Sequence, residues 1–368
     1  MTATGPLAGV LIADFGRVLA APYATMLLAD LGAEVIKIER PGTGDDTRSW
    51  GPPFHDGEAT YFQSVNRNKR SVALDLSDRR AVELAGRADV VVENFKPGTM
   101  ARFGLDYESL SRGNPGLVYC SVTGFGAKSD MPGYDLLIQA VGGLMSVTGE
   151  EGGPPLKTGV ALVDVLTGLH ATVGILAALR HRDRTGEGQL VEVDLLSTLL
   201  ASMVNQSSGY ALAGVVPGRL GNRHPSIAPY QVFPAADAEL VVAVGNDGQF
   251  AALCEVLDLP PDPRFARNAD RVAHVDDLAS LLTARLRTRP VNHWIPLLTA
   301  RGVPCGPVND LAAAFGLAAE LGLDPIVPLG DGVTVANPIK LSRTPPRYIR
   351  RPPKLAEHTV PEHTVEDR

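Results

Sequence analysis

The sequence has 368 residues, of which 45% are hydrophobic, so it is long enough for two ordinary domains or one large domain with an excursion. Its net charge of −7 argues against a surface that binds nucleic acid, and an anionic ligand would need a local cluster of bases. Three cysteines without CxxC spacing, with no signal peptide and no run of about 18 apolar residues, predict a soluble cytoplasmic protein that has reduced thiols and no metal site.

A βαβ unit is predicted at the start of the chain. Residues 10–14 form a continuous apolar run typical of a buried parallel strand, 20–31 follow as a helix closed by Gly32, and 34–39 form the next strand. The linking loop, FGRVLAAP, is not a GxGxxG fingerprint. A tight dinucleotide site is therefore not indicated, although Glu39 stands where such a fold would hold a ribose.

A group of three bases precedes the next predicted strand. Arg67, Lys69 and Arg70 lie within the segment NRNKRSVALDL. Such a run is usually a solvated surface, but in an acidic protein it is also the obvious clamp for a phosphate. The residues alone leave both interpretations open.

The recurrence of strands and helices predicts the fold class. A helix at 81–87 and strands at 89–93, 117–122 and 189–194 continue the pattern. We therefore expect an α/β fold with a doubly wound, Rossmann-like parallel sheet. This large domain should span 1–194.

A change of composition near residue 214 predicts a second domain. A linker helix and loop at 195–224 should lead to a smaller α+β domain at 225–312. A return linker at 313–329 should then bring residues 330–368 back to complete the large domain. The polar tail, with its EHTV repeat, is expected to be frayed or wrapped on a surface.

Asp164 lies at a predicted strand-to-helix junction, between an apolar run at 159–163 and a long helix. As an N-cap it would accept a hydrogen bond from the first helical turn. As a reactive group it would be held ionised by the helix N-terminus, where α/β folds place their chemistry. Gly168 and Gly174 each cost the helix about 1 kcal/mol relative to Ala, which indicates close approach of another backbone or a ligand.

A helix predicted from Asp135 to about Ala140 leads to a glycine pair, Gly142 and Gly143. Glycine pairs are most often plain turns. They also expose backbone N–H groups that hold a developing oxyanion.

Eight segments in order resemble the class III CoA-transferase family, which includes formyl-CoA and carnitine CoA-transferases and the α-methylacyl-CoA racemases. They are PLAGVLIADF, LLADLGAEVIKIERPGTGD, NRNKRSVALDL, VVENFKPGTM, PGYDLLIQAVGGLMSVTG, ALVDVLTGLHATVGILAALRHRDRTGEGQ, GNRHPSIAPYQVF and GNDGQF. The resemblance runs from about residue 6 to about residue 310 and recurs near the end in LAEHT.

The resemblance implies that Asp164 is the nucleophile, that CoA is a co-substrate and that two chains form an interlocked homodimer. It implies a CoA site made by Arg40, Leu74, Asn94, Phe95, Lys96, Arg102 and Tyr134. We expect Gly142 and Gly143 to contact the oxyanion and Asp135 to assist in positioning.

Two departures from the family pattern bear on the choice of reaction, and the first favours CoA transfer, of EC 2.8.3 type, over racemisation. The related racemases carry a His where this chain has Tyr134, and a Tyr cannot easily replace imidazole as a base near pH 7. The Gln that formyl-CoA transferases carry near Leu19 is absent, as is their glycine-rich loop, which argues against oxalate as the acceptor.

The remaining segments resemble the branch that acts on dicarboxylic acids such as succinate and glutarate, with succinyl-CoA as a candidate donor. Arg223 and His224 would then either bind a distal carboxylate or have a structural role. An acyl-CoA racemase is the main alternative. A nucleotide-dependent dehydrogenase and a catalytically silent CoA-binding protein are the others.

Overall fold

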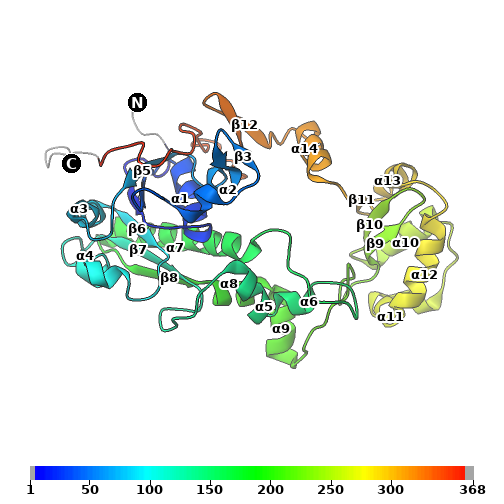
Figure 1. Cartoon of the computed structure of the whole chain (residues 1–368). Coiled ribbons are helices and arrows are strands. Elements are labelled where there is room, and N and C mark those ends of the chain that lie inside the picture. The colour runs from blue at the N-terminus through cyan, green and yellow to red at the C-terminus, as the bar shows by residue number, and fades with distance from the viewer. Residues whose placement is uncertain (1–4, 361–368) are drawn as a thin grey trace. The chain divides into compact units, whose positions relative to one another are not determined.

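The computed structural model describes residues 5–360, and Figure 1 shows its elements. The chain divides into two compact units. The first contains the residues up to 144, residues 157–215 and those from 324 onward, while the second contains 145–156 and 216–323. The sequence did not predict that residues 145–156 belong with the second unit.

The first unit is built on a six-stranded sheet in which every neighbouring pair is parallel. Its order is β5–β2–β1–β6–β7–β8. The strands are β1 (Leu11–Asp14), β2 (Glu34–Glu39), β5 (Lys69–Ala73), β6 (Val90–Glu93), β7 (Val118–Thr123) and β8 (Leu190–Asp194). The strand order reverses between β1 and β6, where doubly wound folds open a crevice at the carboxyl ends of the strands. The predicted doubly wound α/β fold is confirmed.

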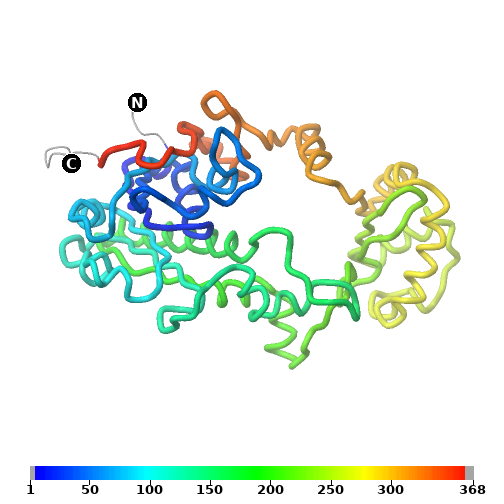
Figure 2. The backbone as a smooth tube through the Cα atoms, viewed as in Figure 1, coloured from blue at the N-terminus to red at the C-terminus, as the bar shows by residue number. Residues whose placement is uncertain are grey.

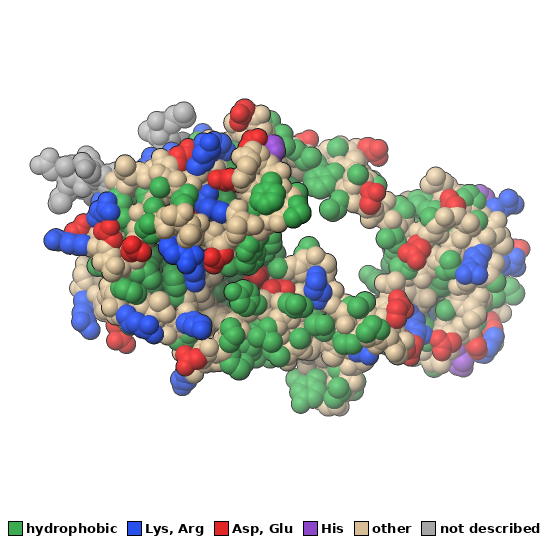
Figure 3. All heavy atoms as spheres, viewed as in Figure 1, with side chains coloured by type: hydrophobic (Ala, Val, Ile, Leu, Met, Phe, Trp, Pro, Cys, Tyr) green, Lys and Arg blue, Asp and Glu red, His purple; other side chains and the backbone are tan. Residues whose placement is uncertain are grey.

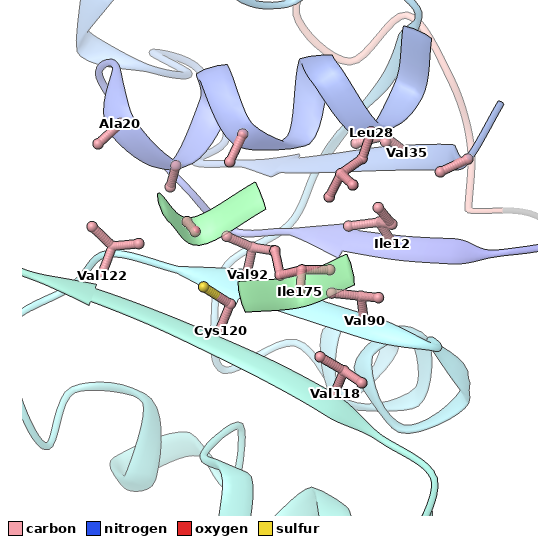
Figure 4. Packing of buried hydrophobic residues seen from close by; sticks show 14 of the residues in the cluster. Ile12, Ala20, Leu28, Val35, Val90, Val92, Val118, Cys120, Val122 and Ile175 are labelled. Atoms are coloured by element: carbon pink, nitrogen blue, oxygen red, sulfur yellow. The ribbon is translucent and has the colours of Figure 1, made fainter. Parts of the chain in front are cut away.

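Helices cover both faces of this sheet. Helices α1 (Ala20–Asp30) and α7 (Leu162–Thr185) pack on one face, and α3 (Arg79–Arg87) and α4 (Tyr107–Ser111) pack on the other. Successive side chains of a strand point to opposite faces, so the four inner strands β1, β2, β6 and β7 contribute apolar residues to both clusters. Figure 4 shows the first cluster, in which Ile12 and Val90 of the sheet meet Leu28 of α1 and Ile175 of α7.

The glycines inside α7 permit the close packing that the sequence predicted. A Cβ atom on Gly168 would lie 2.6 Å from the carbonyl oxygen of Ala20 in α1. One on Gly174 would lie 2.7 Å from a methyl group of Val191 in β8. By length and composition α7 could also cross a membrane, but its buried residues belong to the core of the first unit.

The start of α7 corrects the sequence analysis. The apolar run at 159–163 is not a strand, because the helix already begins at Leu162. Residues 159–161 are not part of any strand, and Val160 is 63% exposed.

The helix predicted within the linker at 195–224 is in fact two helices, α8 (Leu195–Ser202) and α9 (Val204–Ala213). Val204 has a φ of 36°, outside the right-handed helical region, so a single helix cannot continue through it.

The second unit is a smaller α+β structure, as expected. Its three antiparallel strands are β9 (Tyr230–Pro234), β10 (Glu239–Ala243) and β11 (Cys305–Pro307). Its helices are α10 (Asp247–Val256), α11 (Asn268–Ala273), α12 (Val275–Leu286), α13 (Val291–Ala300) and α14 (Leu311–Glu320).

Shorter elements complete the first unit. They are the hairpins β3 (Phe54–His55) with β4 (Glu58–Ala59) and β12 (Ile326–Leu329) with β13 (Gly332–Val335), and the helices α2 (Thr60–Gln63) and α5 (Asp135–Val141). The short helix α6 (Leu144–Val147) leads into the second unit.

The C-terminal segment lies along β5, the edge strand of the sheet, and Figure 2 shows it, in red, beside the blue N-terminal part. Asn68 donates its N–H to the carbonyl of Arg350, and His358 donates its N–H to the carbonyl of Ser71. The tail is therefore wrapped on the surface up to residue 360. The second EHTV repeat lies outside the described residues.

Candidate active site

The site is a cavity at the carboxyl ends of β1, β6 and β7, at the reversal point of the strand order. Loops that follow these strands form its walls, and the N-terminal ends of α1 and α7 close it. It is lined by Arg17, Val18, Leu19, Ala20, Asp46, Asn94, Phe95, Lys96, Pro97, Val122, Thr123, Gly124, Ser129, Met131, Pro132, Gly133, Tyr134, Asp164 and Leu195. Asp164 thus shares a cavity with four of the seven residues predicted to bind CoA.

Asp164 is not the N-cap of its helix. The cap position belongs to Ala161, and Asp164 is the third residue of α7. The capping oxygen comes from Asp135, whose Oδ1 accepts the N–H of Val163 at 2.8 Å and that of Asp164 at 3.2 Å. Because a neighbouring carboxylate caps the helix, the Asp164 side chain is left to face the cavity.

The environment of Asp164 disfavours its ionised form. Burial, with the negative charge of Asp135 in addition, raises the pKa of Asp164 to about 7. Asp135 itself is held by Gln139, which donates to its Oδ2 at 2.6 Å. Burial, and then the charge of Asp164, also raises the pKa of Tyr61, to about 12. A carboxyl group that titrates near neutrality in a cavity is a candidate reactive group.

The loop between β1 and α1 is held in a strained conformation beside Asp164. Val18 has a φ of 67°, a region that β-branched residues rarely occupy. The Asp45 carboxylate accepts the Val18 N–H at 3.3 Å, and Asn94 bonds the neighbouring Arg17 twice, accepting its N–H at 2.9 Å and donating to its carbonyl at 2.7 Å. Strain of this kind persists where surrounding contacts enforce it, and it clusters at functional sites.

A buried ion pair between Lys37 and Asp45 holds this loop in place. Lys37 donates to Asp45 at 2.9 Å and to the carbonyl of Gly16 at 2.7 Å, and both charged side chains are fully buried. Burial alone would raise the pKa of Asp45, but the charge of Lys37 and the Thr47 N–H outweigh it and hold that pKa at about 2. The pair therefore stays ionised at neutral pH.

The three bases around the start of β5, Arg67, Lys69 and Arg70, form neither a solvated run nor a phosphate clamp. Lys69 is fully buried and pairs with Asp14 at 3.0 Å, and Arg67 pairs with the buried Asp30 at 2.6 Å. Arg70 pairs with Glu34 at 3.1 Å. Both interpretations of this segment were wrong, because every base has a carboxylate partner in the first unit.

A second cavity adjoins the first. It is lined by Arg17, Lys37, Ile38, Glu39, Arg40, Gly44, Asp45, Leu74, Asp75, Leu76, Ser77, Phe95 and Phe103. The predicted CoA residues Arg40 and Leu74 lie here, while Phe95 lines both cavities. Glu39 also lines it, but Arg48 donates to the Glu39 carboxylate at 2.7 and 2.8 Å, so this carboxylate is already engaged where a ribose was considered.

Several predicted residues lie outside these cavities. Arg102 is exposed in the short helix Met100–Phe103 and lines neither. Gly142 donates its N–H to the Ile138 carbonyl at 2.8 Å, which corrects the prediction that this amide serves an oxyanion. Gly143 also lines neither cavity. Asp135 contacts Asp164 by accepting its backbone N–H at the N-terminal end of α7.

Arg223 and His224 lie in the second unit, engaged with their own neighbours. Arg223 pairs with Glu151 and, at 2.7 Å, with Asp276. His224 accepts the N–H of Ser226 at 3.0 Å and packs edge-on against Tyr230. These contacts favour the structural interpretation of both residues.

Three residues that line the Asp164 cavity were not predicted from the sequence: Arg17, Val18 and Asp46. The loop FGRVLAAP was rejected as a dinucleotide fingerprint, but its place after the first strand of a doubly wound sheet was already a signal. Among residues 5–360, no group of three or more His, Cys, Asp or Glu is placed to hold a metal ion.

Comparison with known proteins gives consistent results. The model for CoA-transferase family III matches residues 7–359. The succinate–glutarate CoA-transferase of Agrobacterium fabrum is 44% identical over 96% of this chain and 94% of its own length. The acetyl-CoA:oxalate CoA-transferase of Acetobacter aceti is 41% identical over 92% of this chain and 90% of its own.

A solved structure agrees. The crystal structure of a CAIB/BAIF family protein from Brucella suis superposes with a TM-score of 0.86 at 41% identity, over 96% of this chain and 97% of that one. With nearly the whole length matched in sequence and in fold, the chain belongs to CoA-transferase family III.

Proposed function

We propose that this protein is an acyl-CoA:carboxylate CoA-transferase that works through a covalent intermediate on Asp164. The observation that carries the proposal is the shared cavity of Asp164, Asn94, Phe95, Lys96 and Tyr134. Succinyl-CoA is the first candidate donor and a small dicarboxylic acid the first candidate acceptor, since a 44% identical relative is named for succinate and glutarate.

Each step exchanges one acyl bond for another. The Asp164 carboxylate attacks the carbonyl of the donor thioester, which forms a mixed anhydride and releases CoA thiolate. The thiolate attacks the aspartyl carbonyl, which frees the donor acid and leaves an aspartyl-CoA thioester. The acceptor carboxylate then attacks the aspartyl carbonyl of this thioester, which forms a second mixed anhydride and expels the CoA thiolate again. The thiolate attacks the acceptor carbonyl of this anhydride, which forms the acceptor acyl-CoA. Asp164 is regenerated as a carboxylate, and no proton is gained or lost overall.

The first turn of α1 is the better candidate for the oxyanion contact. Ala20 lines the cavity with Asp164, and the amide groups of Ala20 and Ala21 open the helix, where no intrahelical acceptor is available. Gly168 allows α7 to approach Ala20 closely, which brings the nucleophile beside these donors.

Two features favour transfer over racemisation. The residues that line the Asp164 cavity include no histidine, and Tyr134 stands where the related racemases carry theirs. The lining of this cavity therefore offers no imidazole that could return an α-proton.

We also propose that two chains assemble as a homodimer, the interlocked form that the sequence resemblance implies. The first unit exposes large apolar side chains along successive helices, including Val141 (57% exposed), Val173 (66%), Tyr210 (63%) and Leu212 (88%). Figure 3 shows apolar side chains gathered over α9. Light scattering at micromolar concentration should give twice the mass of the chain, and a monomer would contradict the assembly.

The decisive experiment is to trap the intermediate. The protein is incubated with succinyl-CoA, treated with hydroxylamine and analysed by mass spectrometry, and Asp164 should carry a hydroxamate. Asp164→Ala should lose both the adduct and turnover. Asp78→Ala, which removes an exposed helix-capping carboxylate of α3, should keep both.

Acceptors should be compared in the same assay. Glutarate, succinate and oxalate all belong in the panel, because the 41% identical relative is named for oxalate although the sequence argued against that acid. Deuterium exchange at the α-carbon without acyl transfer would instead identify a racemase. An unmodified Asp164 in the presence of full turnover would overturn the covalent mechanism.

A further inference from the structure

Arg17 lies where the two cavities of the first unit meet. It is shared by both linings, as is Phe95. On the proposed function, on which this inference rests, the nucleotide end of CoA occupies the cavity of Arg40 and Leu74 and the thioester reaches Asp164 in the other. The part of CoA that joins its adenosine to its pantetheine is a diphosphate, which carries two negative charges. It has to pass this boundary.

The Arg17 side chain is prearranged at that point. Asn94 fixes its backbone through both the N–H and the carbonyl. The guanidinium lies over the ring of Phe95, 4.7 Å from its centre, and the side chain is 39% exposed. Planar stacking of this kind orients the donors of an arginine with little loss of side-chain freedom.

The charge of Arg17 is only loosely engaged within the protein. Its ion contact is with Asp46, at 3.9 Å, whereas the same carboxylate lies 3.0 Å from Arg40. Within residues 5–360 the buried Nε of Arg17 has no hydrogen-bond partner. A ligand oxygen can therefore replace a weak contact instead of breaking a strong one.

We propose that Arg17 binds the diphosphate of CoA, together with Arg40. A guanidinium presents paired donors that match phosphate oxygens, and such charge-assisted bonds are stronger than neutral ones. Arg17 and Arg40 both contact the Asp46 carboxylate, at 3.9 and 3.0 Å, so the two guanidinium groups lie on either side of one carboxylate. No ion pair joins Arg17 to Asp164 in the described part of the chain, although both line the first cavity.

The test compares CoA binding by the wild type with that by Arg17→Gln and Arg17→Lys, using calorimetry at one fixed ionic strength. Arg17→Gln should weaken the affinity for CoA about ten- to hundredfold, the range expected for lost hydrogen bonds to a charged group. Arg17→Lys should fall between, because it keeps the charge but loses the paired donors.

Arg264→Gln is the matched control, because Arg264 also lies over an aromatic ring, Phe265, and pairs with Asp262 and Asp277 in the second unit. It lines neither cavity, and its loss should leave CoA affinity unchanged.

A truncated donor separates the phosphate role from other roles. Adduct formation on Asp164 is followed with succinyl-CoA and with succinyl-pantetheine, which lacks the diphosphate and the nucleotide. Arg17→Gln should slow the reaction of succinyl-CoA and leave that of succinyl-pantetheine equal to wild type, with the KM for the acceptor acid unchanged.

Three results would overturn the assignment: CoA affinity within twofold of wild type, an equal loss of rate with both donors, or a raised KM for the acid alone. None of them would affect the proposed function, which is tested separately by adduct formation on wild-type Asp164 and by acyl transfer.

Discussion

A buried carboxyl group has two conflicting requirements in this chemistry. In the proposed reaction Asp164 acts as the carboxylate, yet burial and the charge of Asp135 raise its pKa to about 7, so near neutrality a large share of the free enzyme holds it protonated. The compensation is that a desolvated carboxylate is a better nucleophile than a hydrated one. In the proposed reaction Asp135 therefore has two effects: it holds the first turn of α7 in place, and its charge raises the pKa of Asp164.

Replacing Asp135 by asparagine should separate these two effects. In Asp135→Asn the side-chain oxygen still accepts the N–H groups of Val163 and Asp164, but the like charge is gone. Since the ionised form reacts, adduct formation rises with pH through the pKa of Asp164, and in the variant the midpoint should move to lower pH by about one unit or less. The variant should be faster than wild type at pH 6 and similar at pH 8.

The measurement is the rate of hydroxamate-trapped adduct as a function of pH. Asp78→Asn, which changes an exposed carboxylate far along the chain, should leave the midpoint in place. A midpoint that stays the same or rises in Asp135→Asn would show that the charge of Asp135 does not set the titration of Asp164.

At the scale of single elements, lysines in two strands of the sheet serve the fold. The chain places Lys69 in β5 and Lys37 in β2, both fully buried, where they neutralise Asp14 and Asp45. Removal of one member of such a pair leaves an unpaired buried charge, which typically costs about 3–5 kcal/mol.

Lys69→Met should therefore lower the free energy of unfolding by about 3–5 kcal/mol while the folded fraction keeps its affinity for CoA. Lys96→Met is the comparison variant with the opposite expectation, because Lys96 is exposed and lines the Asp164 cavity, whereas Lys69 is buried in the sheet. It should weaken CoA binding and leave stability within about 0.5 kcal/mol of wild type. Denaturant unfolding measures the free energy of unfolding of each variant, and calorimetry measures its affinity for CoA. A loss of CoA affinity in stable Lys69→Met protein would restore the phosphate-clamp interpretation.

The packing of α7 on α1 depends on a position without a side chain. Alanine favours helices by about 1 kcal/mol over glycine, but a Cβ on Gly168 would meet the Ala20 carbonyl oxygen at 2.6 Å. We expect Gly168→Ala to destabilise the protein by about 1–3 kcal/mol and to slow adduct formation, because α7 must shift and carry Asp164 with it.

The control is Gly86→Ala in α3, where an added Cβ meets nothing within 4 Å. That variant should be as stable as wild type or up to about 1 kcal/mol more stable, with unchanged activity. Thermal unfolding and the adduct assay compare the two. If Gly168→Ala is as stable and as active as Gly86→Ala, α7 does not depend on close approach to α1.

The strands of the sheet were predictable because they are buried on both faces and form continuous apolar runs, as at 10–14 and 34–39. The start of α7 was not predictable in the same way. Its capping oxygen comes from Asp135, which lies 28 residues before the first amide it accepts, and no local pattern reveals such a contact. The proposed role of Asp164 came from the family resemblance, since position alone allowed a helix cap as well as a reactive group.

On the scale of the whole molecule, the chain leaves the first unit near residue 215 and returns near 324. Sequence composition predicted the departure, but it did not predict what fixes the return. Asp30, at the end of α1, is fully buried and accepts hydrogen bonds from Arg67 and Asn68 and, at 3.0 Å, from Asn337 of the returning segment. A single carboxylate thus joins residues from three distant parts of the sequence.

Asn337→Ala tests this attachment. It removes the bond to Asp30 and the one that Asn337 accepts from the Ile339 N–H, at a cost of about 1–3 kcal/mol. We expect the loss to loosen the segment that follows, so hydrogen exchange should speed up at Ile349 and Arg350, whose amides bond Asn68.

Asn268→Ala is the matched control for this variant, because Asn268 makes a comparable pair of backbone contacts, with Ser226 and Ala228, inside the second unit. It should leave exchange at residues 349 and 350 unchanged, because stability is lost locally when sites share no partners. Equal acceleration in both variants would mean that the return segment opens only with global unfolding. Acceleration in Asn337→Ala alone would show that the contact of Asp30 with Asn337 holds the returning segment on the first unit, and that this segment opens independently of global unfolding.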